Sequence, residues 1–111
     1  MMKTGSLIAS GIGVSPGLID GPIRIVNSVG ELTDVMEGEI LVVKKSNPAW
    51  TVGMMKAAAL ICEVGGIICH AAIVAREMGI PCVVNVPDAV NTFATGSRVR
   101  VDGTEGKIYV A

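Results

Sequence analysis

One stretch of this chain decides how the rest is interpreted, and it reads Gly65-Gly66-Ile67-Ile68-Cys69-His70-Ala71-Ala72-Ile73-Val74-Ala75-Arg76-Glu77-Met78-Gly79-Ile80-Pro81. It contains the only histidine among 111 residues, which follows a glycine pair and precedes a run of helix-forming residues. Residues 71–78 favour a helix, Gly79 can adopt the left-handed conformation that ends one, and Pro81 prevents its continuation. We therefore predict a short helix with His70 at or beside its N-terminus.

The environment expected for this histidine favours an anion. Backbone N–H groups at a helix N-terminus have no intrahelical partner, and the helix dipole is positive there. Gly65 and Gly66 allow the backbone to turn tightly and leave space beside the imidazole. Such a histidine is suited to covalent phosphoryl carriage, in which a neutral ring nitrogen attacks phosphorus. The ordinary alternative for a lone histidine is a capping or core residue.

The stretch also carries a family resemblance. Its pattern, Gly65-Gly66-x-x-Cys69-His70-Ala71-Ala72-Ile73-Val74-Ala75-Arg76-Glu77-x-Gly79-Ile80-Pro81, resembles the phosphohistidine signature of the phosphoenolpyruvate (PEP)-utilising enzymes. These include pyruvate phosphate dikinase, PEP synthase, enzyme I of the phosphotransferase system and rifampin phosphotransferase. The resemblance implies a mobile, swivelling domain whose histidine carries phosphate between two distant active sites. Weaker similarity extends it over nearly the whole chain: the Gly-x-x-x-Ser-Pro-Gly pattern of residues 11–17 resembles the start of the family domain, and residues 101–109 resemble its end.

The resemblance implies a role for four residues. His70 is the expected catalytic residue, and Gly65, Gly66 and Cys69 are expected to support the phosphate loop. Ile68 departs from the family pattern, which usually has Thr, Ser or Asn at that position. Arg76 lies six residues along the helix from His70, on a different side, and we interpret it as a salt-bridging or packing residue.

The resemblance further implies partners that this chain does not contain. A nucleotide-binding, ATP-grasp-like domain or subunit and a PEP/pyruvate-binding one are expected to supply ATP or PEP together with Mg²⁺. We expect no cofactor or metal in this chain, which we treat as one mobile domain over residues 1–111. It is then a phosphotransferase component that is not active alone. Two alternatives stay open: a non-catalytic regulatory or interaction domain with the same fold, and a thiol or metal module built on Cys69 and His70.

Composition narrows the class of protein. Half of the residues are hydrophobic but only 3% are aromatic, so the core must be aliphatic, as in sheets faced by small-residue helices. A net charge of −1 gives no reason to expect binding to nucleic acid or an anionic membrane surface. After Met1-Met2-Lys3 no signal peptide is evident, and no apolar stretch reaches the length of a membrane span. We therefore expect a cytoplasmic protein without nucleic-acid or membrane partners.

The three cysteines do not suggest a disulfide framework or a zinc site. Their number is odd and no Cys-x-x-Cys pair occurs, which favours a reducing compartment. A zinc site would need all three thiols and His70 to converge. We interpret Cys62 and Cys82 as small buried hydrophobic residues.

The remaining pattern predicts an α/β fold, a swivelling β/β/α arrangement with mixed sheet layers and two or three short helices. Residues 11–17 are expected to form a turn-rich entry, Gly21-Pro22 an edge position or bulge, and residues 27–38 a loop or irregular helix. A helix over residues 49–58 is expected after the cap Asn47, and a helical turn over 87–93. Strands are expected at residues 18–26, 39–43, 59–62, 82–85, 98–101 and 107–110.

Overall fold

A computed structural model describes residues 5–111 of the chain. The strands are β1 (Leu7–Ser10), β2 (Ile12–Ser15), β3 (Leu18–Val26), β4 (Ile40–Val43), β5 (Ala59–Cys62), β6 (Cys82–Val84), β7 (Arg98–Asp102) and β8 (Lys107–Val110). The helices are α1 (Thr51–Met54), α2 (His70–Met78) and α3 (Ala89–Thr92), with 3-10 turns η1 (Val29–Asp34) and η2 (Pro48–Trp50). All strands join one sheet in the order β1-β8-β7-β3-β4-β5-β6-β2.

The central strands β4 and β5 are buried along their whole length. Both are continuous apolar runs, as expected for parallel strands that are covered on both faces. Successive side chains point to opposite faces, so Leu41 and Val43 pack in one core cluster while Ile40 and Val42 pack in another. The parallel part of the sheet, from β3 to β6, therefore separates two hydrophobic cores.

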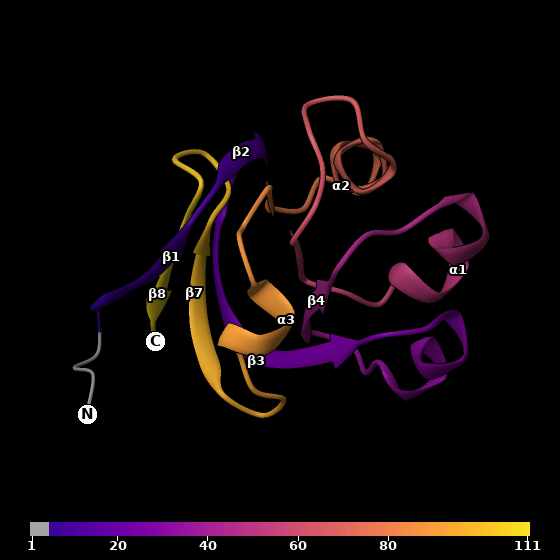
Figure 1. The fold of residues 1–111 in the computed structure, drawn as a ribbon, viewed down its shortest axis with the longest axis horizontal. Coiled ribbons are helices and arrows are strands. Elements are labelled where there is room, and N and C mark those ends of the chain that lie inside the picture. Colours follow the sequence, from indigo (N-terminus) through magenta and orange to yellow (C-terminus); the bar gives the residue numbers. More distant parts are fainter. Residues whose placement is uncertain (1–4) are drawn as a thin grey trace.

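Figure 1 shows the resulting layers, with α1 and α2 on one side of the central strands and β1, β7 and β8 on the other. The first core contains buried residues of β4, β5, α1 and α2. The second contains residues of β4, β5, β7, β8 and α3. The predicted β/β/α arrangement with a mixed sheet and two or three short helices is confirmed.

Residues 11–17 correct one prediction, because four of them form strand β2 instead of a turn-rich entry. Strands β1 and β2 are separated only by Gly11, and they pair with β8 and β6, at opposite ends of the strand order. The chain thus bridges the two ends of the sheet. Glycines make this possible: a Cβ on Gly13 would collide with the carbonyl oxygen of Gly103, and one on Gly11 with that of Val84.

Strand β3 runs through both halves of the sheet. Residues 18–22 pair with β7, whereas Ile23 to Val26 pair with β4. Pro22 lies at the end of the first segment, where β3 pairs with β7 alone, so its missing N–H breaks no bond to β4. The edge interpretation of Gly21-Pro22 is therefore right for one side of the strand, although β3 as a whole is a central strand.

The helix predicted over residues 49–58 is much shorter in the structure. Asn47 is a cap, as predicted, but of the 3-10 turn η2: its side-chain Oδ1 accepts a 2.9 Å hydrogen bond from the Ala49 N–H. A 3-10 turn then leads into α1, which ends at Met54. Gly53 and the β-branched residues before it are weak helix formers, and the chain must return to the sheet at Ala59.

A partly buried ion pair fastens the start of β4 to β3. The Arg24 guanidinium donates two 3.0 Å hydrogen bonds to the Glu39 carboxylate, which also accepts a 2.7 Å bond from the Met36 N–H. Glu39 is only 8% exposed. These bonds satisfy the buried acid and fix the turn that leads into β4.

Candidate functional site

His70 is the first residue of α2, as the sequence predicts. Cys69 is the extended residue that precedes the helix, and its carbonyl accepts a 3.1 Å hydrogen bond from the Ile73 N–H. The helix ends at Gly79, which adopts the left-handed conformation with φ of 72°, and the Ile80 N–H donates to the Ala75 carbonyl. Both ends of the histidine-bearing helix are therefore defined by the local sequence.

Each ring nitrogen of His70 has a hydroxyl partner. Ser46 Oγ lies 2.7 Å from Nδ1, and Thr51 Oγ1 lies 2.8 Å from Nε2. A neutral imidazole has one N–H donor and one acceptor, so one hydroxyl accepts from the ring and the other donates to it. The two contacts hold the ring between the loop after β4 and the first residue of α1.

The sheet topology brings Ser46 to this position. Strands β4 and β5 are parallel, so their C-terminal ends lie at one edge of the sheet, where chemistry commonly occurs in α/β folds. Ser46 follows β4, and the loop after β5 leads to His70. The two loops are joined by backbone bonds: the Glu63 N–H donates to Val43, and the Val64 N–H donates to Lys44 at 2.8 Å.

The environment favours the uncharged form of the histidine. His70 is half-buried, and this burial lowers its pKa from the ordinary value of 6.5. Burial has this direction because desolvation penalises the imidazolium more than the imidazole. Burial therefore favours the form of the ring that has one lone pair to act as a nucleophile.

The glycine pair lies in the turn before α2, as predicted. A Cβ on Gly65 would lie 2.9 Å from Cys69 Sγ and 3.4 Å from the Val84 Cβ, so its missing side chain leaves room for these neighbours instead of the imidazole. Gly66 borders open space, and its carbonyl accepts a 3.2 Å bond from the Cys69 N–H. Gly65, Gly66 and Cys69 thus shape the turn into α2, while their role toward phosphate stays a prediction.

Arg76 is tied to the scaffold. Its Nε donates a 2.8 Å hydrogen bond to the carbonyl oxygen of Val14, which joins α2 to β2. This contact agrees with the packing interpretation of Arg76.

The loop before His70 exposes large apolar side chains. Ile68 is 84% exposed and Ile67 is 63% exposed, and Ile73 one turn into α2 is also exposed. Packing against residues 5–111 therefore does not explain why Ile68 departs from the family pattern.

The cysteines lie where the sequence indicates. Cys62 and Cys82 are buried in the core below α2, and burial raises the pKa of both thiols, that of Cys62 to about 12. Cys69 is half-buried and packs against the same core. Within residues 5–111 no three His, Cys, Asp or Glu side chains are grouped so that they could hold a metal ion.

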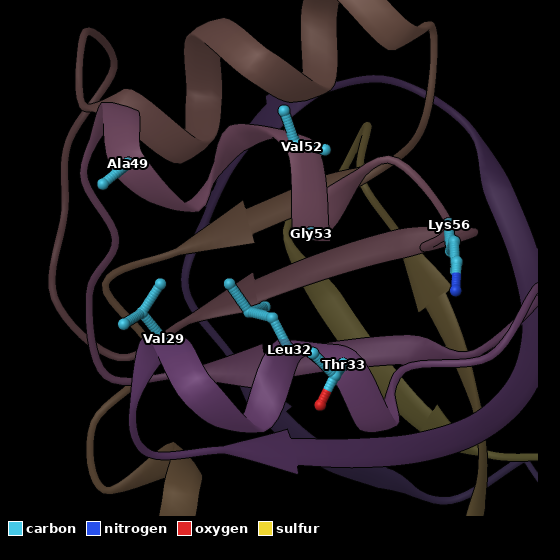
Figure 2. A pocket seen from close by; sticks show the side chains of 7 residues that line it. All are labelled: Val29, Leu32, Thr33, Ala49, Val52, Gly53 and Lys56. Atoms are coloured by element: carbon cyan, nitrogen blue, oxygen red, sulfur yellow. The ribbon is translucent and has the colours of Figure 1, made fainter.

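A separate groove lies beside the site, between η1 and α1. Its volume is about 360 Å³, and Figure 2 shows its lining side chains: Val29, Leu32, Thr33, Ala49, Val52, Gly53 and Lys56. Leu32 of η1 packs close to Gly53 of α1, where an added Cβ would lie 2.7 Å from the Leu32 Cβ. The groove borders the element that carries Thr51 but does not contain His70.

Sequence reasoning found His70 but missed both hydroxyls. Ser46 was part of a polar break after β4, and Thr51 was an ordinary helical position. The available signal was weak: a hydroxyl residue follows a strand that is parallel to the strand leading to His70. Only the register of β4 and β5 shows that the two loops meet.

Comparison with known protein families identifies a close match. The family described as PEP-utilising enzyme, mobile domain, matches residues 35–106, which include Ser46, Thr51 and His70. Phosphoenolpyruvate synthase of Pyrococcus furiosus is 42% identical over 108 residues, which are 97% of this chain and 13% of that protein. Rifampicin phosphotransferase of Bacillus subtilis is 41% identical over 100 residues, 90% of this chain and 11% of that protein. The chain therefore spans about an eighth of the curated relatives it matches.

Solved structures give a consistent fold. An enzyme I structure determined by NMR has a TM-score of 0.62 and 32% identity, and the match covers 71% of this chain and 33% of that one. Aconitase X of Thermococcus kodakaraensis has a TM-score of 0.69 at 21% identity, covering 93% of this chain and 97% of that one, which shows a shared fold alone. Among residues 5–111, no helix is long and apolar enough to cross a membrane.

Proposed function

Because this chain belongs to the PEP-utilising enzymes as their mobile domain, we propose that it is a phosphocarrier module whose His70 is transiently phosphorylated. The observation that carries the proposal is the geometry around the ring. A half-buried imidazole stands at a helix N-terminus with a hydroxyl at each nitrogen, and burial favours its uncharged form. This arrangement provides a lone pair for attack and neutral donors for phosphoryl oxygens.

The transfer step balances without a cofactor bound by this chain. The lone pair of one ring nitrogen forms a bond to phosphorus while the bond between phosphorus and the donor oxygen breaks, and the electron pair leaves with that oxygen. The hydroxyl at the attacking nitrogen must rotate away to admit the phosphorus. The second hydroxyl continues to hold the other nitrogen, so the ring keeps its orientation during attack.

The other reactants belong to partners. Phosphoryl transfer depends on metal ions and cationic groups around the transferred oxygens, and the stretch from Val64 to Ile73 contains no charged residue. We therefore assign Mg²⁺ and ATP or PEP to a nucleotide-binding partner and a PEP/pyruvate-binding partner, as separate subunits or as further domains. The large part of each relative that lies outside the matched region is consistent with such partners. By itself the chain would carry phosphate without completing a reaction.

The carrier chemistry can be tested without a partner. Phosphoramidate, a small phosphoryl donor, should label the wild-type chain on His70, with ammonia leaving as the P–N bond of the donor breaks. The label should be stable in alkali, labile in acid and absent from His70→Gln, whose fold is checked by urea unfolding. Absence of label from the wild type, or its persistence in the variant, would refute the proposal.

The pH dependence of this labelling has a defined sign. Only the neutral imidazole has a lone pair, so the rate should rise with pH through the pKa of His70. Because burial lowers that pKa from its ordinary value, the rise should be centred at a lower pH than for an exposed histidine. The rate is normalised to that of free imidazole, which corrects for protonation of the donor itself.

A second experiment addresses the donor. Radiolabelled PEP and Mg²⁺ are added with the Pyrococcus furiosus PEP synthase from which the region matching this chain has been removed. Labelling of wild-type chain, lost in His70→Gln, would support PEP as the source of phosphate. Labelling by phosphoramidate but not by PEP would retain the carrier chemistry and exclude this partner class as the donor.

A further inference from the structure

We infer that Ser46 is the positioning residue of this site. Its hydroxyl accepts a hydrogen bond from the protonated Nδ1 of His70, and the lone pair on Nε2 is then left for attack. The inference rests on the proposed function and adds the group that decides which nitrogen reacts. It starts from the 2.7 Å contact between Ser46 Oγ and Nδ1.

The partners of an imidazole determine where its single proton lies. In the neutral ring one nitrogen carries hydrogen and the other carries a lone pair, and the hydrogen bond at one nitrogen sets the state of the other. At His70 both nitrogens have hydroxyl partners, and the inference assigns the proton to the nitrogen that faces the better anchored hydroxyl. A hydroxyl is also able to accept from N–H or donate to a lone pair, which keeps the contact when the ring changes its charge.

Ser46 is the better anchored of the two. It lies three residues beyond β4, every residue of which is buried, and backbone bonds from Glu63 and Val64 join the intervening chain to the loop after β5. Thr51 opens a helix of four residues, and the next side chain, Val52, is 80% exposed. Both side chains are half-buried, so the difference lies in the backbone: the segment before Ser46 is bonded to the loop after β5, whereas Thr51 begins a helix of four residues.

This difference gives the two hydroxyls different roles during attack: Thr51 moves away from Nε2, and Ser46 holds Nδ1–H. The Thr51 side chain can rotate about its Cα–Cβ bond and open Nε2 toward the surface, where a donor can approach. Ser46 meanwhile retains Nδ1–H, so the ring does not turn as the bond to phosphorus forms. Nε2 is also the nitrogen farther from the backbone, which reduces steric conflict with an incoming phosphoryl group.

The first test reads the tautomer directly. The chain has one histidine, so the ¹⁵N shifts of the two ring nitrogens can be assigned without ambiguity at pH 8, where the ring is neutral. We expect Nδ1 to carry the proton in the wild type. Ser46→Ala should lower the Nδ1–H population, Ser46→Thr should restore it, and Thr51→Val should leave it in place. A wild-type ring protonated at Nε2 would overturn the inference even if Ser46→Ala failed to fold.

The second test measures transfer from phosphoramidate. Loss of one hydrogen bond that positions the nucleophile should slow labelling of Ser46→Ala by about 2- to 10-fold. Ser46→Thr should recover most of the rate. Ser97→Ala removes an exposed hydroxyl between α3 and β7, outside the site, and serves as the matched control with an unchanged rate.

The outcomes separate this inference from the proposed function. If the wild type is not labelled at all, the carrier function and the role of Ser46 both fail. If the wild type is labelled and Ser46→Ala has the same rate and tautomer, the carrier function stands and the inference is overturned. A purely structural role for Ser46 would lower stability in the urea assay but leave the tautomer unchanged, which also counts against the inference.

Discussion

The ion pair between Arg24 and Glu39 provides a sharp test of how the scaffold is held. We expect Glu39→Gln to destabilise the protein because the substitution keeps the shape of the side chain but removes its charge. The carboxylate accepts three hydrogen bonds: two of 3.0 Å from Arg24 and one of 2.7 Å from the Met36 N–H. The amide can accept some of these bonds, but it leaves the guanidinium without a counter-charge.

The expected magnitude follows from the number of bonds and their exposure. A bond to a charged group is worth about 1 kcal/mol more than a neutral one, and three such bonds would give an upper limit of about 3 kcal/mol. The Arg24 side chain is 26% exposed, so solvent screens part of its interaction. We expect Glu39→Gln to lower the free energy of unfolding by about 1–2 kcal/mol at pH 7.

The assay is urea unfolding, followed by the fluorescence of the single tryptophan, Trp50, which is half-buried against the first core. A matched control exists on the same strand, β3. Asp20 accepts two bonds from Arg100, of 2.7 and 3.0 Å, but both side chains are more than 40% exposed. Asp20→Asn should therefore change stability less than Glu39→Gln does, because exposed ion pairs contribute little.

The pH dependence gives a second, independent check. Burial alone would raise the pKa of Glu39, but the hydrogen bonds from Arg24 and Met36 and the guanidinium charge outweigh it, and the pKa lies below its usual value. A carboxyl group with a depressed pKa in the folded state adds stability above the unfolded pKa, near about 4.3, and this is lost as pH falls through the folded pKa. The difference between wild type and Glu39→Gln should therefore shrink on acidification. Equal stabilities at pH 7, or a difference that persists undiminished at pH 2, would refute this reasoning.

Two further predictions concern backbone contacts and thiol access. Gly103→Ala should lower the free energy of unfolding by about 1–3 kcal/mol in the urea assay, because its Cβ would collide with the carbonyl oxygen of Ser15. Gly30 faces open space, so Gly30→Ala should not have this effect. Similar unfolding midpoints for the two variants would contradict the close packing at Gly103. In the native protein at pH 8, iodoacetamide should modify Cys69 before the two buried cysteines, because burial raises the pKa of the Cys62 thiol to about 12. The order of modification is measured by peptide mass spectrometry. Modification of Cys62 before Cys69 would disprove the prediction.

The elements that follow from local sequence were predictable. Residues 18–26 and 59–62 form strands with the predicted bounds. His70 begins a helix as predicted, and this helix ends where Gly79 and Pro81 indicate. These signals operate over a few residues, so they can be read without knowledge of the fold.

The features that sequence reasoning missed depend on distant contacts. Strand β2 was not predicted because glycine, found at positions 11 and 13, is a weak strand former. The turn between β7 and β8 approaches both glycines closely, and this contact is evident only in the folded structure. Ser46 and Thr51 precede His70 by 24 and 19 residues, so their contact with the ring depends on the pairing of β4 with β5. A hydroxyl in a loop has no distinguishing pattern until that register is known.

The uncharged stretch around His70 has a thermodynamic consequence for a carrier. From Val64 to Ile73 the chain offers neutral hydrogen-bond donors but no fixed positive charge. A dianionic group on the ring would therefore take any counter-charge from outside that stretch, such as Lys44 and Lys45, which precede Ser46 in the loop after β4. The stretch itself then adds no ion pair that must break on release, so on its side of the ring the free energy of the N–P bond stays available to the acceptor.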